Sequence, residues 1–97
     1  MIEEMIRSFA DKETEKVFRG GRTRRLAAWL QRTARRRMFI LDAADRLNDL
    51  LIPPGNRLEK LAGKRAGQYS VRINEQWRIC FRLRRGDAHE VKIVDYH

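Results

Sequence analysis

Hydrophobic and polar positions follow a helical period in the first half of the chain. Between about residues 24 and 49 the apolar side chains recur with helical spacing, which predicts a long amphipathic helix. Three consecutive arginines, residues 35–37, mark the place where this helix would bend or split. Pro53-Pro54-Gly55-Asn56 ends the helix and begins a loop. The apolar positions are Leu26, Trp29, Leu30, Ala34, Leu41, Ala44, Leu47 and Leu51.

Two shorter elements are predicted before this helix. Met5–Phe9 alternates apolar and polar residues, as a short strand does. Asp11 is a suitable N-cap for a brief helix that runs to about Phe18, and Gly20-Gly21 ends it.

The second half of the chain changes to a period of two, which predicts strands. In Gln68–Asn74 one side carries Tyr69, Val71 and Ile73, and the other carries Ser70, Arg72 and Asn74. A turn around Glu75-Gln76 leads to a second strand, Trp77–Leu83. There Ile79, Phe81 and Leu83 are expected to face the core, opposite Arg78, Cys80 and Arg82.

A third strand follows the turn at residues 84–87 and runs from His89 to about Tyr96. Three strands joined by tight turns predict an antiparallel meander with helices on one face. The expected fold class is therefore α+β, in a single domain of 97 residues. A chain of this size has room for one core, so its function is expected on an open face or in a shallow groove.

The chain is strongly basic, with 22 Lys and Arg against 13 Asp and Glu and a formal net charge of +9. A small domain with this charge usually binds a polyanion, most often nucleic acid. A membrane surface or an acidic protein are the alternative partners. The sequence contains no signal peptide and no apolar run of membrane-spanning length, so a cytoplasmic protein is expected.

Arginines are expected side by side on the sheet face away from the core. Arg72, Asn74, Arg78 and Arg82 fall on this face of neighbouring strands. Like charges placed together repel unless an anion lies over them, which favours a polyanion-binding face. Cys80 is the only cysteine, which excludes an intrachain disulfide and a cysteine-rich zinc site, and it is interpreted as a small buried apolar residue.

Five segments, in order, resemble a known family. They are Met5–Phe9, Pro54-Gly55-Asn56-Arg57-Leu58-Glu59, the run from Gly67 to Asn74, Gln76-Trp77-Arg78-Ile79-Cys80-Phe81, and Val94-Asp95-Tyr96-His97. Together they resemble the HigB branch of the RelE superfamily, also called plasmid-maintenance killer proteins. The resemblance covers the chain from Met5 onward, so Met1–Glu4 is expected to be an extension, or translation to start at Met5.

The resemblance implies a ribonuclease fold with two N-terminal helices on a curved antiparallel sheet. It implies a toxin of a type II toxin–antitoxin system that cleaves messenger RNA in the ribosomal A site. The implied partner is a helix-turn-helix antitoxin, HigA-like, and operator DNA would be bound only through the complex with it.

Cleaving RNA without a metal requires four contributions from side chains. The 2′-hydroxyl must lose a proton, the phosphate must be held in line, its growing charge must be stabilised, and the leaving 5′-oxygen must gain a proton. The chain has two histidines, His89 and His97, and no metal-ligand pattern, so we predict a metal-independent reaction and no cofactor.

Arg72 and Arg78 are the first candidates to bind the scissile phosphate, with a structural ion pair to a helix carboxylate as the alternative for Arg78. Asn74 would contact a base or phosphate, or serve only the turn. The resemblance assigns His97 as general acid or base, although a terminal histidine alone would be interpreted as a frayed end. It further implies that Tyr96 stacks on or hydrogen-bonds the substrate and that Asp95 orients a neighbour or shares proton transfer.

The chain departs from some relatives that carry a His-Pro-Leu-Lys-Gly segment. Here the corresponding stretch is Glu59-Lys60-Leu61-Ala62-Gly63, without the His and the Lys. Glu59 would replace the base or be an ordinary surface residue, and Lys64 and Arg65 would supply charge from just downstream.

Eight arginines and no acidic residue lie between Arg19 and Arg37. They would dock on ribosomal RNA or bind an acidic stretch of the antitoxin, and the first is preferred. Trp29 is expected in the core and Trp77 in a structural position. Two other functions stay open: a non-catalytic nucleic-acid-binding module and an inactive component of a regulatory complex.

Overall fold

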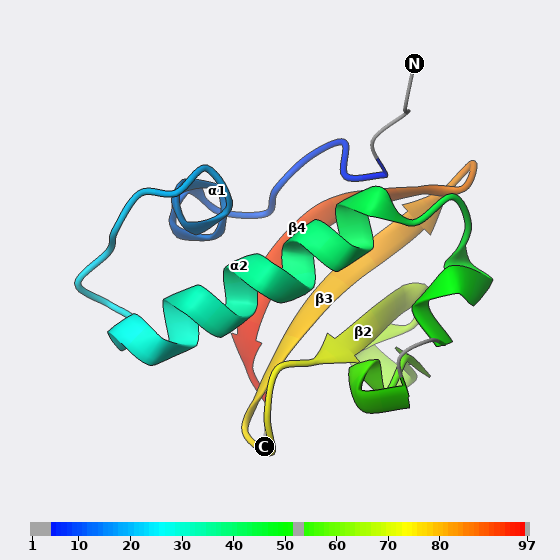
Figure 1. Cartoon of the computed structure of the whole chain (residues 1–97). Helices are drawn as coiled ribbons and strands as arrows, with labels where there is room; N and C mark the ends of the chain where they lie inside the picture. The colour runs from blue at the N-terminus through cyan, green and yellow to red at the C-terminus, as the bar shows by residue number, and fades with distance from the viewer. Residues whose placement is uncertain (1–4, 52–53, 97) are drawn as a thin grey trace.

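The computed structural model describes residues 5–51 and 54–96 of the chain. Two helices, α1 (Lys12–Phe18) and α2 (Ala28–Ala43), precede an antiparallel sheet with the strand order β1-β2-β3-β4. Figure 1 shows α2 lying across the sheet with α1 beside it. The predicted α+β class is confirmed. The strands are β1 (Glu59–Lys60), β2 (Gln68–Arg72), β3 (Trp77–Arg84) and β4 (Asp87–Asp95).

The core lies between α2 and the inner face of the sheet. Ile79 and Phe81 are fully buried, as the alternation along the strand predicts, and Leu83 and Trp77 pack partly buried against the same core. The residues that α2 buries fall on one helical stripe, and together they form the apolar layer over β2, β3 and β4. This stripe consists of Leu30, Ala34, Met38 and Leu41.

The long helix predicted for residues 24–49 is shorter and straighter than expected. It starts at Ala28, runs through residues 35–37 without interruption and ends at Ala43. A separate 3₁₀ turn covers Leu47–Leu51. Asp49 explains the stop, because its carboxylate accepts hydrogen bonds from the backbone N–H groups of residues 45 and 46 and so caps the new turn.

The expectation that Trp29 is a core residue is wrong. Trp29 is 47% exposed, although Leu30 beside it is buried. The inward stripe begins at Leu30, and one residue along a helix rotates the side chain by about 100°. Trp29 therefore lies at the edge of the stripe, in the first turn of α2.

The opening segment runs beside β4 without forming a regular strand. Parallel bridges join Ile6 to Ala88 and Phe9 to Val91, in place of the strand predicted at Met5–Phe9. Main-chain hydrogen bonds connect the same segment to β4. At the end of α2, the Asp42 carbonyl accepts a hydrogen bond from the N–H of Met5, and the Asp42 carboxylate accepts one from the N–H of Ile6. After it, Asp11 accepts a hydrogen bond from the N–H of Thr14, as predicted for an N-cap.

A second, smaller apolar cluster lies on the outer face of the sheet. Leu61, Cys80 and Val94 are buried there, and Tyr96 packs against them. Cys80 is thus buried, as expected. Among residues 5–51 and 54–96, no helix combines the length and apolar character needed to cross a membrane.

Candidate functional site

The register of β2 and β3 brings two arginines together on the outer face. Arg72 is the direct partner of Arg78, and Ser70 is the partner of Cys80. Directly paired residues point to the same side of a sheet, with Cβ atoms about 5 Å apart. The predicted adjacency of Arg72 and Arg78 is therefore confirmed.

Arg78 is held more firmly than a surface arginine. Its residue is only 7% exposed. Its Nε donates to Ser70 Oγ at 2.6 Å, and its Nη2 donates to the carbonyl oxygen of Arg57 at 2.5 Å. Arg57 has a left-handed backbone conformation with φ 41°, which non-glycine residues seldom adopt. In this conformation its carbonyl oxygen points toward the guanidinium of Arg78. The guanidinium is fixed in one orientation.

The remaining side of this guanidinium faces Glu59 and Tyr96. Glu59 Oε1 lies 3.9 Å from Arg78 Nη1, so the ion pair considered for Arg78 exists, with a carboxylate of β1 and not of a helix. The Tyr96 ring centroid lies 6.0 Å from the guanidinium carbon. We call Arg78, Glu59, Tyr96 and Arg72 the Arg78 cluster. It brings together guanidinium groups that can bind a phosphate, a carboxylate and a phenol.

Asp95 lies at the end of the sheet beside Trp77, its direct partner. Because Trp77 belongs to the inner face, this register places Asp95 on the side opposite Tyr96. Its carboxylate accepts a hydrogen bond from Gln76 Nε2 at 3.2 Å. His97, predicted as general acid or base, lies outside the described residues.

Asn74 serves the turn between β2 and β3. Its side-chain oxygen accepts hydrogen bonds from the backbone N–H groups of Gln76 and Trp77, at 2.8 and 2.7 Å. An asparagine whose oxygen closes its own turn is performing the structural role. Of the two interpretations left open for Asn74, the contacts favour the turn.

A second group of cations surrounds a shallow pocket farther along the outer face. Arg65, from the 3₁₀ turn Gly63–Arg65, and Arg82, from β3, line it together with Lys92 from β4. Glu90 is the single carboxylate of the lining, and its Oε2 lies 3.3 Å from Arg82 Nε. Lys64 lies in the same 3₁₀ turn as Arg65 and is exposed. We call Arg65, Arg82 and Lys92 the distal cation cluster.

The thiol of Cys80 lies under both cation clusters. Burial raises the pKa of Cys80 from its ordinary value of 9.0, and the charges of Arg65, Arg78 and Lys92 lower it by less. The thiol is therefore neutral at pH 7 and forms part of the floor.

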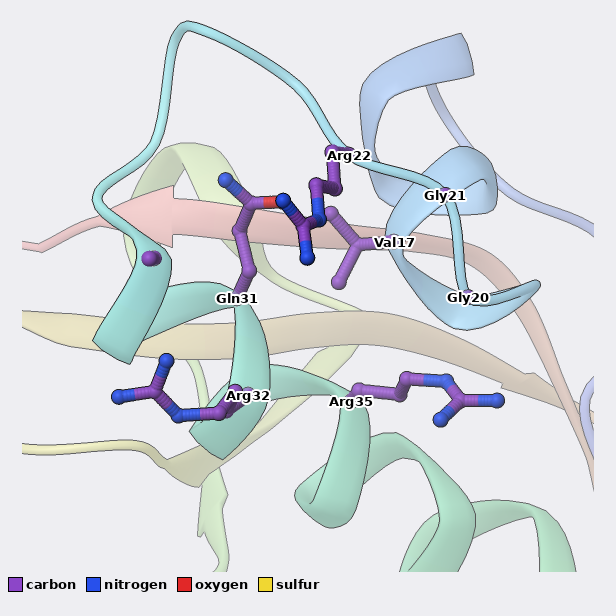
Figure 2. A pocket seen from close by; sticks show the side chains of 8 residues that line it. Val17, Gly20, Gly21, Arg22, Gln31, Arg32 and Arg35 are labelled. Carbon is purple, nitrogen blue, oxygen red and sulfur yellow. The ribbon is translucent and has the colours of Figure 1, made fainter.

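The arginine-rich region forms another hollow, between α2 and the loop after α1. Figure 2 shows the side chain of Arg22 reaching from this loop toward Gln31, with Arg32 and Arg35 below it on α2. Three arginines of the run contact other groups of the chain, and one of them, Arg19, pairs with Glu15 through Nη2 and Oε2 at 3.1 Å. Arg35 Nε donates to the Phe18 carbonyl at 3.2 Å, and Arg37 Nη1 donates to Asn56 Oδ1 at 2.8 Å. The run is consequently less of a free charged face than its sequence suggests.

Sequence reasoning missed the groups that orient Arg78. Ser70 lies on the predicted face, yet its role depends on the register with β3. The Arg57 carbonyl carries no side-chain signal at all. Lys92 was missed as well. It lies two residues before Val94, so the alternation along β4 places both side chains on the outer face.

The chain is similar to known proteins over nearly its whole length. Residues 7–97 match the family described as RelE-like toxin of type II toxin-antitoxin system HigB. "Toxin HigB-1" of Vibrio cholerae is 40% identical over 78 residues, covering 79% of this chain and 82% of that protein. "Endoribonuclease HigB" of Proteus vulgaris is 32% identical over 97 residues, covering 96% and 100%, and its name gives the enzyme class expected from the sequence. The chain therefore belongs to the HigB-like family of RelE-like toxins of type II toxin–antitoxin systems.

Proposed function

We propose that the chain is an endoribonuclease that cleaves messenger RNA in the ribosomal A site without a metal. The observation that carries the proposal is the orientation of the Arg78 guanidinium, which Ser70 and the Arg57 carbonyl hold beside Arg72, Glu59 and Tyr96. A guanidinium fixed before the substrate arrives stabilises growing phosphoryl charge without a further cost of ordering.

The reaction is a transfer within the RNA strand. A base removes the proton of the 2′-hydroxyl, the 2′-oxygen attacks the adjacent phosphorus, and the bond to the 5′-oxygen breaks. The leaving 5′-oxygen takes up a proton, so the products are a 2′,3′-cyclic phosphate and a 5′-hydroxyl. Arg72 and Arg78 bind the phosphoryl oxygens between them.

In this proposal, proton transfer is assigned to residues that the family resemblance points to and to Glu59. His97 is the general acid or base, because its unperturbed pKa of about 6.5 permits both roles near neutral pH. Glu59 is the second proton-transfer group, supported by the 3.9 Å separation of its carboxylate from Arg78. Tyr96 contacts the substrate, and Asp95 orients its neighbours at the end of β4.

The proposed partners rest on the family and on the charge of the other surfaces. The family implies an antitoxin, and we propose that it is a HigA-like helix-turn-helix protein through which operator DNA is bound. Exposed arginines of the run from Arg19 to Arg37 dock on phosphates of ribosomal RNA, and Lys64 adds charge beside the messenger. The proposed site of action is the cytoplasm.

Primer-extension mapping of RNA ends after brief induction without antitoxin tests the activity. We expect growth arrest and new 5′ ends inside translated messages. Arg72→Ala and Tyr96→Phe should lose most of this cleavage while staying folded, and His97→Ala should behave in the same way. Lys12→Ala is the matched control, because Lys12 is exposed on α1, on the helical side of the sheet, and its loss also removes one positive charge.

The competing function, a binding module without catalysis, predicts RNA binding with no new ends. Untranslated transcripts serve as the internal comparison, because a ribosome-dependent enzyme should leave them intact. Cleavage of translated and untranslated RNA at equal rates would contradict the ribosome dependence. Full toxicity in the Arg72, Tyr96 and His97 variants would contradict the assignment of the site.

A further inference from the structure

The distal cation cluster lies in line with the Arg78 cluster along β3. Arg78, Cys80 and Arg82 point outward in turn, and the register shift between Cys80 and Arg82 occurs on the β4 side. Four residues of antiparallel strand span about 14 Å, allowing about 3.4 Å for each. This distance exceeds what one phosphate can bridge, so the two clusters would contact different groups of a ligand.

The floor between the clusters is apolar. Leu61, Cys80 and Val94 are buried there, with exposed fractions of 6%, 1% and 8%. Arg78 and Arg82 therefore lie at the two ends of this apolar stretch, and Lys92, the direct partner of Cys80, lies beside it. This arrangement suits an extended chain with charges at intervals better than a single compact anion.

We propose that Arg65, Arg82 and Lys92 form a second phosphate subsite, which binds a backbone phosphate of the same RNA strand away from the scissile bond. The inference rests on the proposed function. The three side chains come from three separate elements and line one pocket, and Gln68, the direct partner of Arg82, adds an amide donor. Cations brought together in this way repel one another until an anion occupies the space between them.

Glu90 competes with the phosphate for this subsite. Its Oε2 lies 3.3 Å from Arg82 Nε and 3.4 Å from Arg84 Nη2. Glu90 has a positive φ of 54°, and its N–H donates a hydrogen bond to Ser8 Oγ, so the backbone that carries this carboxylate is held beside the pocket. In the RNA complex Arg82 exchanges the carboxylate for the phosphate.

The test compares a long and a short RNA analogue that cannot be cleaved. Binding of a 2′-O-methyl hexanucleotide and of a 2′-O-methyl dinucleoside monophosphate, which has a single phosphate, is measured by NMR titration. Arg65→Ala and Lys92→Ala should each weaken hexanucleotide binding about five- to tenfold and leave dinucleoside binding unchanged. Each should also reduce the slope of log affinity against log salt by about 0.7, the value for one lost phosphate contact in single strands.

Two further variants sharpen the result. Glu90→Gln should tighten hexanucleotide binding about twofold or more, since it removes the competing charge. Lys12→Ala, with the same loss of charge on the helical side, should leave both affinities and the salt slope near those of the parent protein. Circular dichroism of each variant checks that the fold is retained.

The proposal of the subsite would be overturned if Lys92→Ala weakened binding of the long and the short analogue equally. It would also be overturned if Lys92→Ala bound the hexanucleotide as tightly as Lys12→Ala does. Weaker binding by Glu90→Gln would overturn the competition. Failure of the proposed function would look different, because the binding series would hold while the parent protein produced no new RNA ends.

Discussion

Replacing Arg78 with alanine removes the group on which the proposed site is built, and it also removes a structural contact. The side chain is nearly buried, and its loss leaves Ser70 Oγ and the Arg57 carbonyl without their donors. Ser70 is fully buried, and a buried acceptor left unpaired costs about 1–3 kcal/mol, whereas the carbonyl of the exposed residue Arg57 can bind water and adds less. The Glu59 ion pair adds little, because that carboxylate is largely in water.

A central value of about 2 kcal/mol is a considerable part of the 5–15 kcal/mol, roughly, that stabilises a domain of this kind. In urea, with a slope of about 2 kcal/mol per molar, Arg78→Ala should lower the midpoint by about 1 M. Loss of toxicity in this variant would therefore reflect stability as well as chemistry. For this reason Arg72→Ala and Tyr96→Phe are better probes of the reaction.

Arg78→Lys and Ser70→Ala separate the two contributions. Lysine keeps the charge but cannot reach both acceptors with a planar fork, and we expect a loss of about 1–2 kcal/mol. Ser70→Ala removes one acceptor and should cost a similar amount. An Arg78→Ala midpoint within about 0.5 M of the parent protein would refute the claim that buried hydrogen bonds fix the guanidinium.

Three further predictions concern the surroundings of the site. Thr14→Val should lower the free energy of unfolding by about 1–3 kcal/mol, because the Ile93 N–H loses its buried acceptor, Thr14 Oγ1 at 3.0 Å. Thermal unfolding measures this loss, and Thr14→Ser should restore the stability. An unchanged melting temperature in Thr14→Val would contradict the prediction. Asn74→Ala should destabilise the β2–β3 turn by about 1 kcal/mol while leaving RNA cleavage near the parent level; strong loss of cleavage at full stability would instead indicate contact with substrate. Because the pKa of Cys80 is raised in the folded protein, the thiol ionises more easily in the unfolded chain, and the free energy of unfolding should decline as pH rises above 9.0. Urea unfolding between pH 7 and 10 measures this decline, which should be smaller in Cys80→Ala.

The sequence allowed good predictions wherever the signal was local. The alternation in β3 predicted the burial of Ile79 and Phe81, and Asp11 was recognised as an N-cap. The end of α2 at Ala43 was missed. It depends on the Asp49 carboxylate, which accepts the hydrogen bond of the residue 45 N–H that a longer helix would use for its own backbone. The two-residue strand β1 is too short to show a period.

The candidate site divides in the same way. The adjacency of Arg72 and Arg78 follows from a short turn between two strands, which fixes the register within a few residues. The burial of Arg78 depends on the Arg57 carbonyl, 21 positions away in sequence, and a backbone atom leaves no trace in the identity of its residue. The prediction for Trp29 was wrong for a geometric reason. Adjacent residues on a helix point in different directions, so the neighbour of buried Leu30 can be exposed.

The opening segment has a consequence for self-association. β4, the longest strand, lies at one end of the sheet order, where its outward N–H and C=O groups would pair with any extended chain. Residues 5–10 occupy several of these groups along β4, from Ala88 to Val91. Removing the segment would expose these backbone groups of β4, and the shortened chain would be expected to form oligomers in which the β4 strands of neighbouring copies pair.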